Sequence, residues 1–357
     1  SNRRIKKIMA YTDIDDPSNH FAVKLYSGNS NSNAISGVGF QPALVWIKER
    51  TSTSSHNIRD SLRGTNKYIS SDNTAAETTN THLTSFDSDG FTLASSGGIN
   101  NDGDTYFSLN WKAGTTGSGT TTGSGTGKTY SYAVNTDAGF SIIKYIGNGT
   151  ANHTIPHHIG AAPKMVIIKK TSAIDTWMIG HQSIGFTHSI QFKQDAASDT
   201  ADEFNDVAPT STVVNLGSGG EANGNDTNLI MYAFAEKQGY SKFGSFVGSS
   251  ASSFVYLGFK PRFFLWKNSE EGSSTYDHWG MVDSKRQTPN GATDGYIRAS
   301  QTTAESGFSG NGIFFLSNGI KFINTGRYND NTGDKYIYMA FAESPFVTSS
   351  GVPGTAG

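Results

Sequence analysis

The stretch LYSGNSNSNAISGVGFQPALVWIK, residues 25–48, has two counterparts further along this chain. They are KYIGNGTANHTIPHHIGAAPKMVIIK, residues 144–169, and SFVGSSASSFVYLGFKPRFFLWK, residues 245–267. In each stretch an aromatic residue stands two positions before a glycine, and a proline precedes a lysine by six residues. Self-similarity of this kind indicates that one structural unit is repeated in tandem.

The three copies also close alike, each with an Asn, Asp and Gly turn followed by an apolar run. The closing segments are NNDGDTYFSLNWKAG (residues 100–114), NGNDTNLIMYAFAEK (residues 223–237) and NDNTGDKYIYMAFAES (residues 329–344). Their apolar residues alternate as in strands, and short runs such as ALVWIK (residues 43–48) are rich in β-branched and aromatic residues. We therefore predict an all-β protein with three tandem β-sandwich domains of the jelly-roll or concanavalin-A-like type.

Domain boundaries follow from these copies and from local composition. Residues 114–127 read GTTGSGTTTGSGTG, and a segment made only of glycine, serine and threonine indicates a flexible tether. Repeats 2 and 3 join without such a spacer, so we expect them to be closely coupled and repeat 1 to be more mobile. The predicted organisation is an N-terminal arm or leader (1–20), repeat 1 (21–113), a Gly/Ser/Thr-rich linker (114–135), repeat 2 (136–240), repeat 3 (241–346) and a flexible tail (347–357).

The first eight residues, SNRRIKKI, carry four basic side chains ahead of Met9. Two interpretations stay open: a flexible basic arm, or translated leader sequence with Met9 as the natural start. No apolar segment follows the charges, so the stretch does not have the pattern of a secretory signal.

Composition excludes several classes of protein. The 357 residues include 28 Lys plus Arg and 30 Asp plus Glu, a formal charge of −2, whereas nucleic-acid binders usually carry a basic excess. There is no cysteine, which excludes disulfides and thiolate metal sites. No apolar run is long enough for membrane insertion. Only 16% of residues are charged, so the predicted surface consists largely of Ser, Thr, Asn and Gly.

Three motifs resemble ligand-binding sites, and each has a simpler structural explanation. Residues 122–129, TGSGTGKT, resemble a phosphate-binding loop, but the first required glycine is a threonine and a strand pattern follows. Asp87 and Asp89, in DSDG, are a weak calcium candidate, although a tight turn explains them better. The group HTIPHH, residues 153–158, favours a surface loop over a metal site. We expect no cofactor and no other metal site.

Catalytic constellations are not evident in the sequence. Glu236 and Glu343 recur in the AFAE endings, and glycoside hydrolysis needs two carboxylates about 5 to 9.5 Å apart in one cleft. Because these two residues occupy equivalent positions in different copies, we do not expect them to share a cleft. No nucleophile elbow is apparent either. We therefore predict no catalytic residues and a protein that is not an enzyme.

The middle of each copy contains the candidate carbohydrate-binding residues. Asp60, His181 and Asp283 occupy matching positions, and Trp177 and Trp279 precede the last two. A tryptophan face beside a carboxylate or imidazole stacks on a sugar and hydrogen-bonds its hydroxyls. The alternative is a tryptophan packed inside each sandwich, with a polar residue at a strand end.

Several stretches resemble repeats of tail-fibre-like and other virion-associated proteins of marine bacteriophages. The similar stretches are MAYTDIDDPSNHF (9–21), SLRGTNKYISSDNTAAET (61–78), TSFDSDGFTL (84–93), NTDAGFSIIKYIGNGT (135–150) and AFAEKQGYSKFGSF (233–246). The resemblance covers nearly all of the chain, and it is weakest in the third copy. It implies a concanavalin-A-like fold displayed on a phage particle, beside other virion proteins, and implies no catalytic residues.

We therefore expect a virion structural protein: a fibre, a spike or a capsid-surface component at the virion surface. Such a protein contributes to host attachment when many copies make weak contacts with cell-surface glycans. One alternative is a lectin-like carbohydrate-binding protein, and another is a polysaccharide depolymerase. Fibres and spikes of this kind are commonly homotrimers. The resemblance therefore implies a homo-oligomer, with a trimer as the expected state.

Overall fold

The computed structural model confirms an all-β fold built from antiparallel sheets. It describes residues 12–353 apart from 96, 193–198, 201, 250, 271, 273–276, 287–294, 308–311 and 324–332. Helical elements within this described part are single turns: η1 (Pro17–Asn19), η2 (Asp202–Phe204) and α1 (Gly220–Asn223). None of the described helices has the length and apolar character that crossing a membrane requires.

The three repeats contain main sheets with one common strand order. In repeat 1 the order is β1 (Phe21–Ser27), β9 (Thr105–Trp111), β3 (Leu44–Glu49) and β4 (Asn57–Asp60). In repeat 2 it is β13 (Phe140–Ile146), β20 (Asn228–Phe234), β15 (Met165–Lys170) and β16 (Trp177–His181). In repeat 3 it is β21 (Ser241–Val247), β29 (Lys335–Pro345), β23 (Phe259–Asn268) and β24 (Gly280–Asp283). The opening and closing segments of each copy therefore pair as neighbours.

A small outer sheet accompanies each main sheet. The outer sheets are β2 (Asn33–Ser36), β8 (Gly90–Leu93) and β7 (Leu83–Asp87); β11 (Thr122–Gly123), β14 (His153–Pro156) and β19 (Val213–Leu216); and β22 (Ser253–Tyr256), β28 (Gly319–Ile323) and β27 (Gly312–Leu316). Each repeat has its own apolar cluster between its two sheets. Further strands extend the main sheets of repeats 2 and 3: β17 (Gly185–Ile190), β18 (Asp199–Thr200), β25 (Gly295–Arg298) and β26 (Ser306–Gly307). In repeat 1, β5 (Lys67–Tyr68) and β6 (Thr78–Thr79) form a two-stranded sheet of their own.

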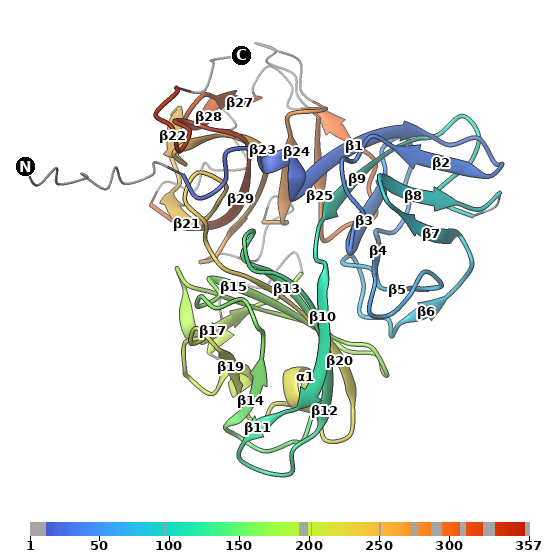
Figure 1. Cartoon of the computed structure of the whole chain (residues 1–357). Coiled ribbons are helices and arrows are strands. Elements are labelled where there is room, and N and C mark those ends of the chain that lie inside the picture. The colour runs from blue at the N-terminus through green and yellow to red at the C-terminus, as the bar shows by residue number, and fades with distance from the viewer. Residues whose placement is uncertain are drawn as a thin grey trace, which may run out of the picture.

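The inner faces of the three main sheets meet in a single central core, and Figure 1 shows the repeats as three lobes around it. Trp111 stands at the meeting point. Its ring centroid lies within 6.5 Å of five phenylalanine rings from all three repeats: Phe21, Phe140, Phe234, Phe263 and Phe341. Repeat 1 is therefore packed into the same core as the other two, whereas the sequence predicted a more mobile repeat 1.

Burial on both faces explains the continuous apolar runs. In β3, Leu44 and Trp46 belong to the central core, whereas Val45 and Ile47 belong to the cluster between the sheets of repeat 1. Strands buried on both faces read as unbroken apolar runs rather than as alternating ones. Each main sheet is thus the middle layer between an outer sheet and the shared core.

The predicted flexible linker is wrong for residues 114–135. The segment forms β10 (Thr115–Thr120) and β12 (Thr129–Asn135), which pair with each other and extend the main sheet of repeat 2 beyond β13. Gly117 lies opposite Tyr132, and a Cβ atom added at Gly117 would lie 2.6 Å from the Tyr132 hydroxyl oxygen. The glycines of this segment therefore make room for tyrosine rings over the edge strand, a pairing that stabilises exposed sheet edges.

The described parts of the predicted arm and tail are packed together. The Thr12 hydroxyl donates to the Gln238 carbonyl oxygen at 2.9 Å, and the Asp13 amide donates to the same oxygen at 3.1 Å. Asp15 accepts a hydrogen bond from the Ser349 amide at 2.6 Å. Residues 1–11, with Met9, and residues 354–357 lie outside the described part of the chain.

Candidate functional site

The residues predicted to form a sugar platform lie in the interior. Trp177 and Trp279 are 2% and 1% exposed, and His181, Asp60 and Asp283 are fully buried. A sugar stacks only on an aromatic face that it can reach. The carbohydrate-binding prediction for these five residues is therefore corrected: they build contacts between repeats. The two tryptophans are packed, as the alternative predicted, but in the core shared by the repeats rather than inside each sandwich.

The tryptophans and one histidine hold neighbouring repeats together. His56 occupies in repeat 1 the position that tryptophan occupies in the other two repeats. Each of these side chains contacts a main-chain oxygen of another repeat: Trp177 Nε1 to Ser70 (2.9 Å), Trp279 Nε1 to Gln191 (2.7 Å) and His56 Nε2 to Arg298 (3.0 Å). Repeat 2 thus contacts repeat 1, repeat 3 contacts repeat 2, and repeat 1 contacts repeat 3. The contacts form a closed circle.

The matching polar residues form a second set of contacts. Asp60 pairs with Arg63 Nε at 2.5 Å and accepts a hydrogen bond from the Tyr232 hydroxyl of repeat 2 at 2.8 Å. Burial, the largest cause, raises the pKa of Tyr232 well above its usual value, so Tyr232 stays a donor. Asp283 pairs with Arg286, whose guanidinium carbon lies 4.4 Å from the centroid of the Phe107 ring of repeat 1. These carboxylates anchor arginines at interfaces.

His181 and His56 are held as neutral imidazoles. His181 Nδ1 accepts the Ser183 amide proton at 3.1 Å, so Nε2 donates to the Tyr338 oxygen of repeat 3 at 3.1 Å. His56 Nδ1 likewise accepts from Trp46 Nε1 at 2.8 Å. Burial lowers the pKa of each imidazole to about 4. Protonation of either ring would leave a buried charge at an interface between repeats.

The weak calcium candidates are engaged in a turn. Asp89 accepts hydrogen bonds from the amides of Gly39 at 2.6 Å and Gly37 at 2.9 Å, and these bonds lower its pKa. Asp87 accepts from the Thr92 hydroxyl at 2.6 Å. Among the described residues no group of three or more His, Cys, Asp or Glu side chains could hold a metal ion. Asp89 thus ties the β7–β8 turn to the neighbouring loop, whereas Asp87 bonds within the hairpin itself.

The histidines of the HTIPHH segment are not a surface loop. His153 is buried, with Nδ1 2.7 Å from Asn223 Oδ1 and Nε2 2.6 Å from Thr121 Oγ1. His157 is buried as well, and the ring centroid of His158 lies 3.7 Å from that of Tyr132. The three side chains therefore fasten the 114–135 segment and neighbouring loops to repeat 2.

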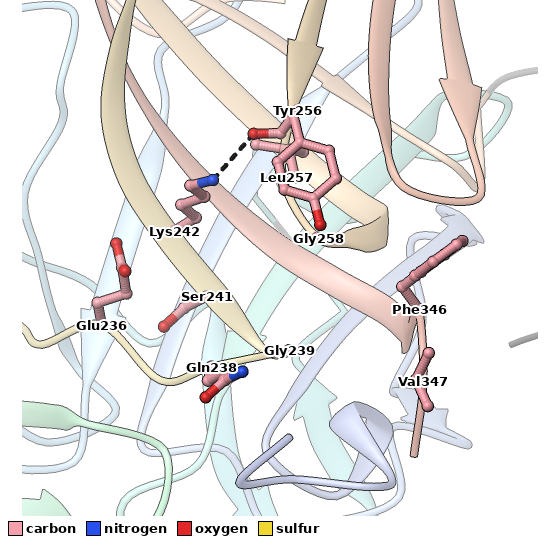
Figure 2. Close-up of a pocket in the computed structure, with 10 residues that line it drawn as sticks. All are labelled: Glu236, Gln238, Gly239, Ser241, Lys242, Tyr256, Leu257, Gly258, Phe346 and Val347. Atoms are coloured by element: carbon pink, nitrogen blue, oxygen red, sulfur yellow. Dashed lines mark hydrogen bonds between the residues drawn. The ribbon is translucent and has the colours of Figure 1, made fainter. Parts of the chain in front are cut away.

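Within the described part of the chain, a groove in repeat 3 is the best candidate site on the surface. It has a volume of about 390 Å³ and lies where repeat 2 passes into repeat 3. Four segments line it: the β20–β21 connection (236–239), the start of β21 (241–242), the end of β22 (256–258) and the chain after β29 (346–347). Figure 2 shows these side chains around the opening. The sequence-based predictions do not include this site.

Two charged side chains cap main-chain groups beside the groove. Lys242 Nζ donates to the Tyr256 carbonyl oxygen at 3.0 Å and lies 5.0 Å from the centroid of the Tyr256 ring (Figure 2). A Glu236 carboxylate oxygen accepts the Phe243 amide at 3.2 Å. The groove therefore contains one cation and one carboxylate, beside an exposed tyrosine.

Aromatic exposure distinguishes repeat 3 from its two counterparts. Tyr256 is 55% exposed, Phe254 48% and Phe346 40%. In β2, β14 and β22 alike the third residue is buried, which aligns the three strands. The residues aligned with Phe254 are Ala34 and Thr154, and those aligned with Tyr256 are Ser36 and Pro156. Comparison of SFVY with NAIS and HTIP is thus the signal by which the sequence reveals this surface.

Comparison with known proteins gives a match that spans all three repeats. No curated protein and no solved structure matches the chain. One family model matches residues 16–345, from η1 to the end of β29. The match is continuous across all three main sheets, so the unit that the family describes is the complete three-repeat body. The chain belongs to the family described as Domain of unknown function (DUF7483).

Proposed function

We propose that this chain is a structural protein at the surface of a bacteriophage particle and helps it attach to host-surface glycans. The observation that carries this proposal is the aromatic groove of repeat 3, presented by a body with a shared core. The resemblance of the repeats to those of virion-associated phage proteins supports the location. Attachment would rest on many weak contacts, one or a few from each copy of the chain.

A body of this kind is suited to display. The shared core around Trp111 joins the repeats into one packed unit, so groove residues need little ordering when a ligand binds. Only 16% of the residues are charged. Contacts made by uncharged polar and aromatic side chains depend little on salt, because ions screen exposed charges and leave such contacts unaffected.

A lectin-like protein is the second candidate, in which recognition is the main task. The exposed Tyr256 and Phe346 beside a mixed polar surface favour it. Hydrolysis of a polysaccharide is less well supported, since Glu236 is the one carboxylate among the lining residues, all of which are described. Glu343, its counterpart, lies 3.8 Å from Lys260 Nζ in an ion pair. Two carboxylates in one cleft are the usual requirement for that chemistry.

A cryo-EM map of the native particle tests the location directly. Ordered density for the three-lobed body at the tail or on the capsid is the expected result. The symmetry of that density also tests the expected homotrimer. A particle that lacks the body, with the protein free in the lysate, would reject the structural role and favour the lectin.

A further inference from the structure

We infer that the groove of repeat 3 binds a short neutral saccharide, with one sugar ring stacked on Tyr256 and Phe346 forming the facing wall. This site differs from the sugar site that the sequence predicted, because that prediction relied on tryptophans that are buried in the structure. The inference names the ligand of the attachment role proposed above and rests on that role only for its biological purpose.

The internal comparison of the repeats argues that Tyr256 is present for a ligand. The fold is formed three times with nearly the same strand order, and two of the three copies form it with Ser36 or Pro156 at this position. Tyr256 is more than half exposed, so it contributes little to the packing of repeat 3. Tyr256 and Phe346 are both exposed and line one groove, and exposed apolar patches with a polar rim mark contact surfaces.

The polar groups of the groove match sugar hydroxyls. Lys242 uses one hydrogen bond on the Tyr256 carbonyl, and an ammonium group has three donors. The Gln238 amide offers a donor and an acceptor, and the Glu236 carboxylate has two oxygens. Stacking on an aromatic ring with hydrogen bonds around its edge is the way in which proteins accommodate an amphipathic ring.

The charges favour a neutral ligand. Glu236 and Lys242 carry opposite charges, so the lining has no net charge to select an anionic or a cationic ligand. The volume of about 390 Å³ lies at the lower end of the range of roughly 300 to 1,000 Å³ found for ligand sites, which suits a short saccharide.

The capped strand edges argue against a peptide as the occupant. An extended peptide binds by pairing with free main-chain groups at a sheet edge. Here Glu236 holds the Phe243 amide, and Gln182 donates its side-chain amide to the Phe243 oxygen. Lys242 holds the Tyr256 oxygen. Three of the main-chain groups that a strand would need at this point are thus already bonded.

The test is a glycan array of neutral and anionic oligosaccharides probed with the full chain, followed by NMR titration of the strongest neutral one. We expect saturable binding in the millimolar to micromolar range. Tyr256→Ala should weaken binding about tenfold or more, because the stacking surface is lost. Tyr256→Phe should stay within about threefold of wild type, since the ring is retained.

Phe254→Ala is the matched control, because Phe254 lies on the same strand with similar exposure but does not line the groove. Its affinity should equal that of the wild type, and all three variants should keep the wild-type melting temperature. Raising the salt concentration from about 0.05 to 0.5 M should leave the affinity unchanged.

Binding confined to anionic glycans, binding unaffected by Tyr256→Ala, or no neutral ligand at about 10 mM would each overturn the inference. A chain that binds sugars but is missing from the particle map refutes the virion role and leaves the saccharide site intact.

Discussion

Replacing Trp111 by alanine tests whether the three repeats are one cooperative unit. Trp111 is 1% exposed, and its ring contacts the five phenylalanine rings contributed by all three repeats. Truncation of a buried tryptophan to alanine typically costs about 3 to 5 kcal/mol, from lost burial and from the cavity that remains. A loss of about 3 kcal/mol raises the equilibrium constant for unfolding more than about 100-fold.

Hydrogen exchange with peptide resolution measures where this loss falls. If the repeats unfold together, the most protected amides of β9, β20 and β29 should all exchange more than about 100-fold faster in Trp111→Ala. Ile174→Ala is the control, because Ile174 is 77% exposed and its removal should change none of these rates. Acceleration confined to repeat 1, with repeats 2 and 3 at wild-type rates, would show that the repeats are independent domains and refute the shared-core argument.

Three further predictions concern stability. His56 and His181 have pKa values of about 4 in the folded protein and near 6.5 in the unfolded chain. The stabilisation from neutral His56 and His181 is therefore complete above about pH 6.5, and the free energy of unfolding falls by about 2 kcal/mol per histidine at pH 5. Equal urea midpoints at about pH 7 and pH 5 would contradict this. Asp283→Ala should cost about 3 kcal/mol, the lower end of the range for a broken buried pair, because Arg286 then keeps only its longer ion pair with Glu305 at 3.5 Å. The double variant Asp283→Leu/Arg286→Met should recover most of that loss in thermal melts, and an equally unstable double variant would argue otherwise. Gly117→Val should raise the hydrogen-exchange rates of the β10 amides by about tenfold without lowering the global melting temperature, because a Cβ atom at this position meets a tyrosine ring. Unchanged rates in β10 would show that the glycine is not needed.

Much of the fold could be predicted from sequence because its signals are local. The run ALVWIK predicts a strand whether one of its faces is buried or both, so runs of this kind identify the strands. The central core cannot be identified in this way, since nothing in the sequence around Trp46 indicates that its ring packs against Phe192, 146 residues further along the chain in repeat 2. Long-range partners of apolar residues leave no trace in a local pattern.

The errors have definite physical reasons. Residues 114–135 contain few apolar side chains before Tyr130, so a strand there depends on main-chain pairing and on glycines that accommodate rings across the strand. Trp177 followed by a polar residue at a strand end describes a buried interface and a sugar platform equally well. The sequence alone does not show that Tyr256 replaces a smaller, non-aromatic residue on an exposed face. That comparison needs the alignment of β2, β14 and β22, which the structure supplies.

The closing of the circle within one chain has a consequence for how its surfaces can change. A circle of three identical chains would carry every substitution three times, once on each lobe. In this chain an alteration at one lobe leaves the other two as they were, so Tyr256 stands where its counterparts are Ser36 and Pro156. Two lobes can keep the scaffold closed while the third acquires a contact surface of its own.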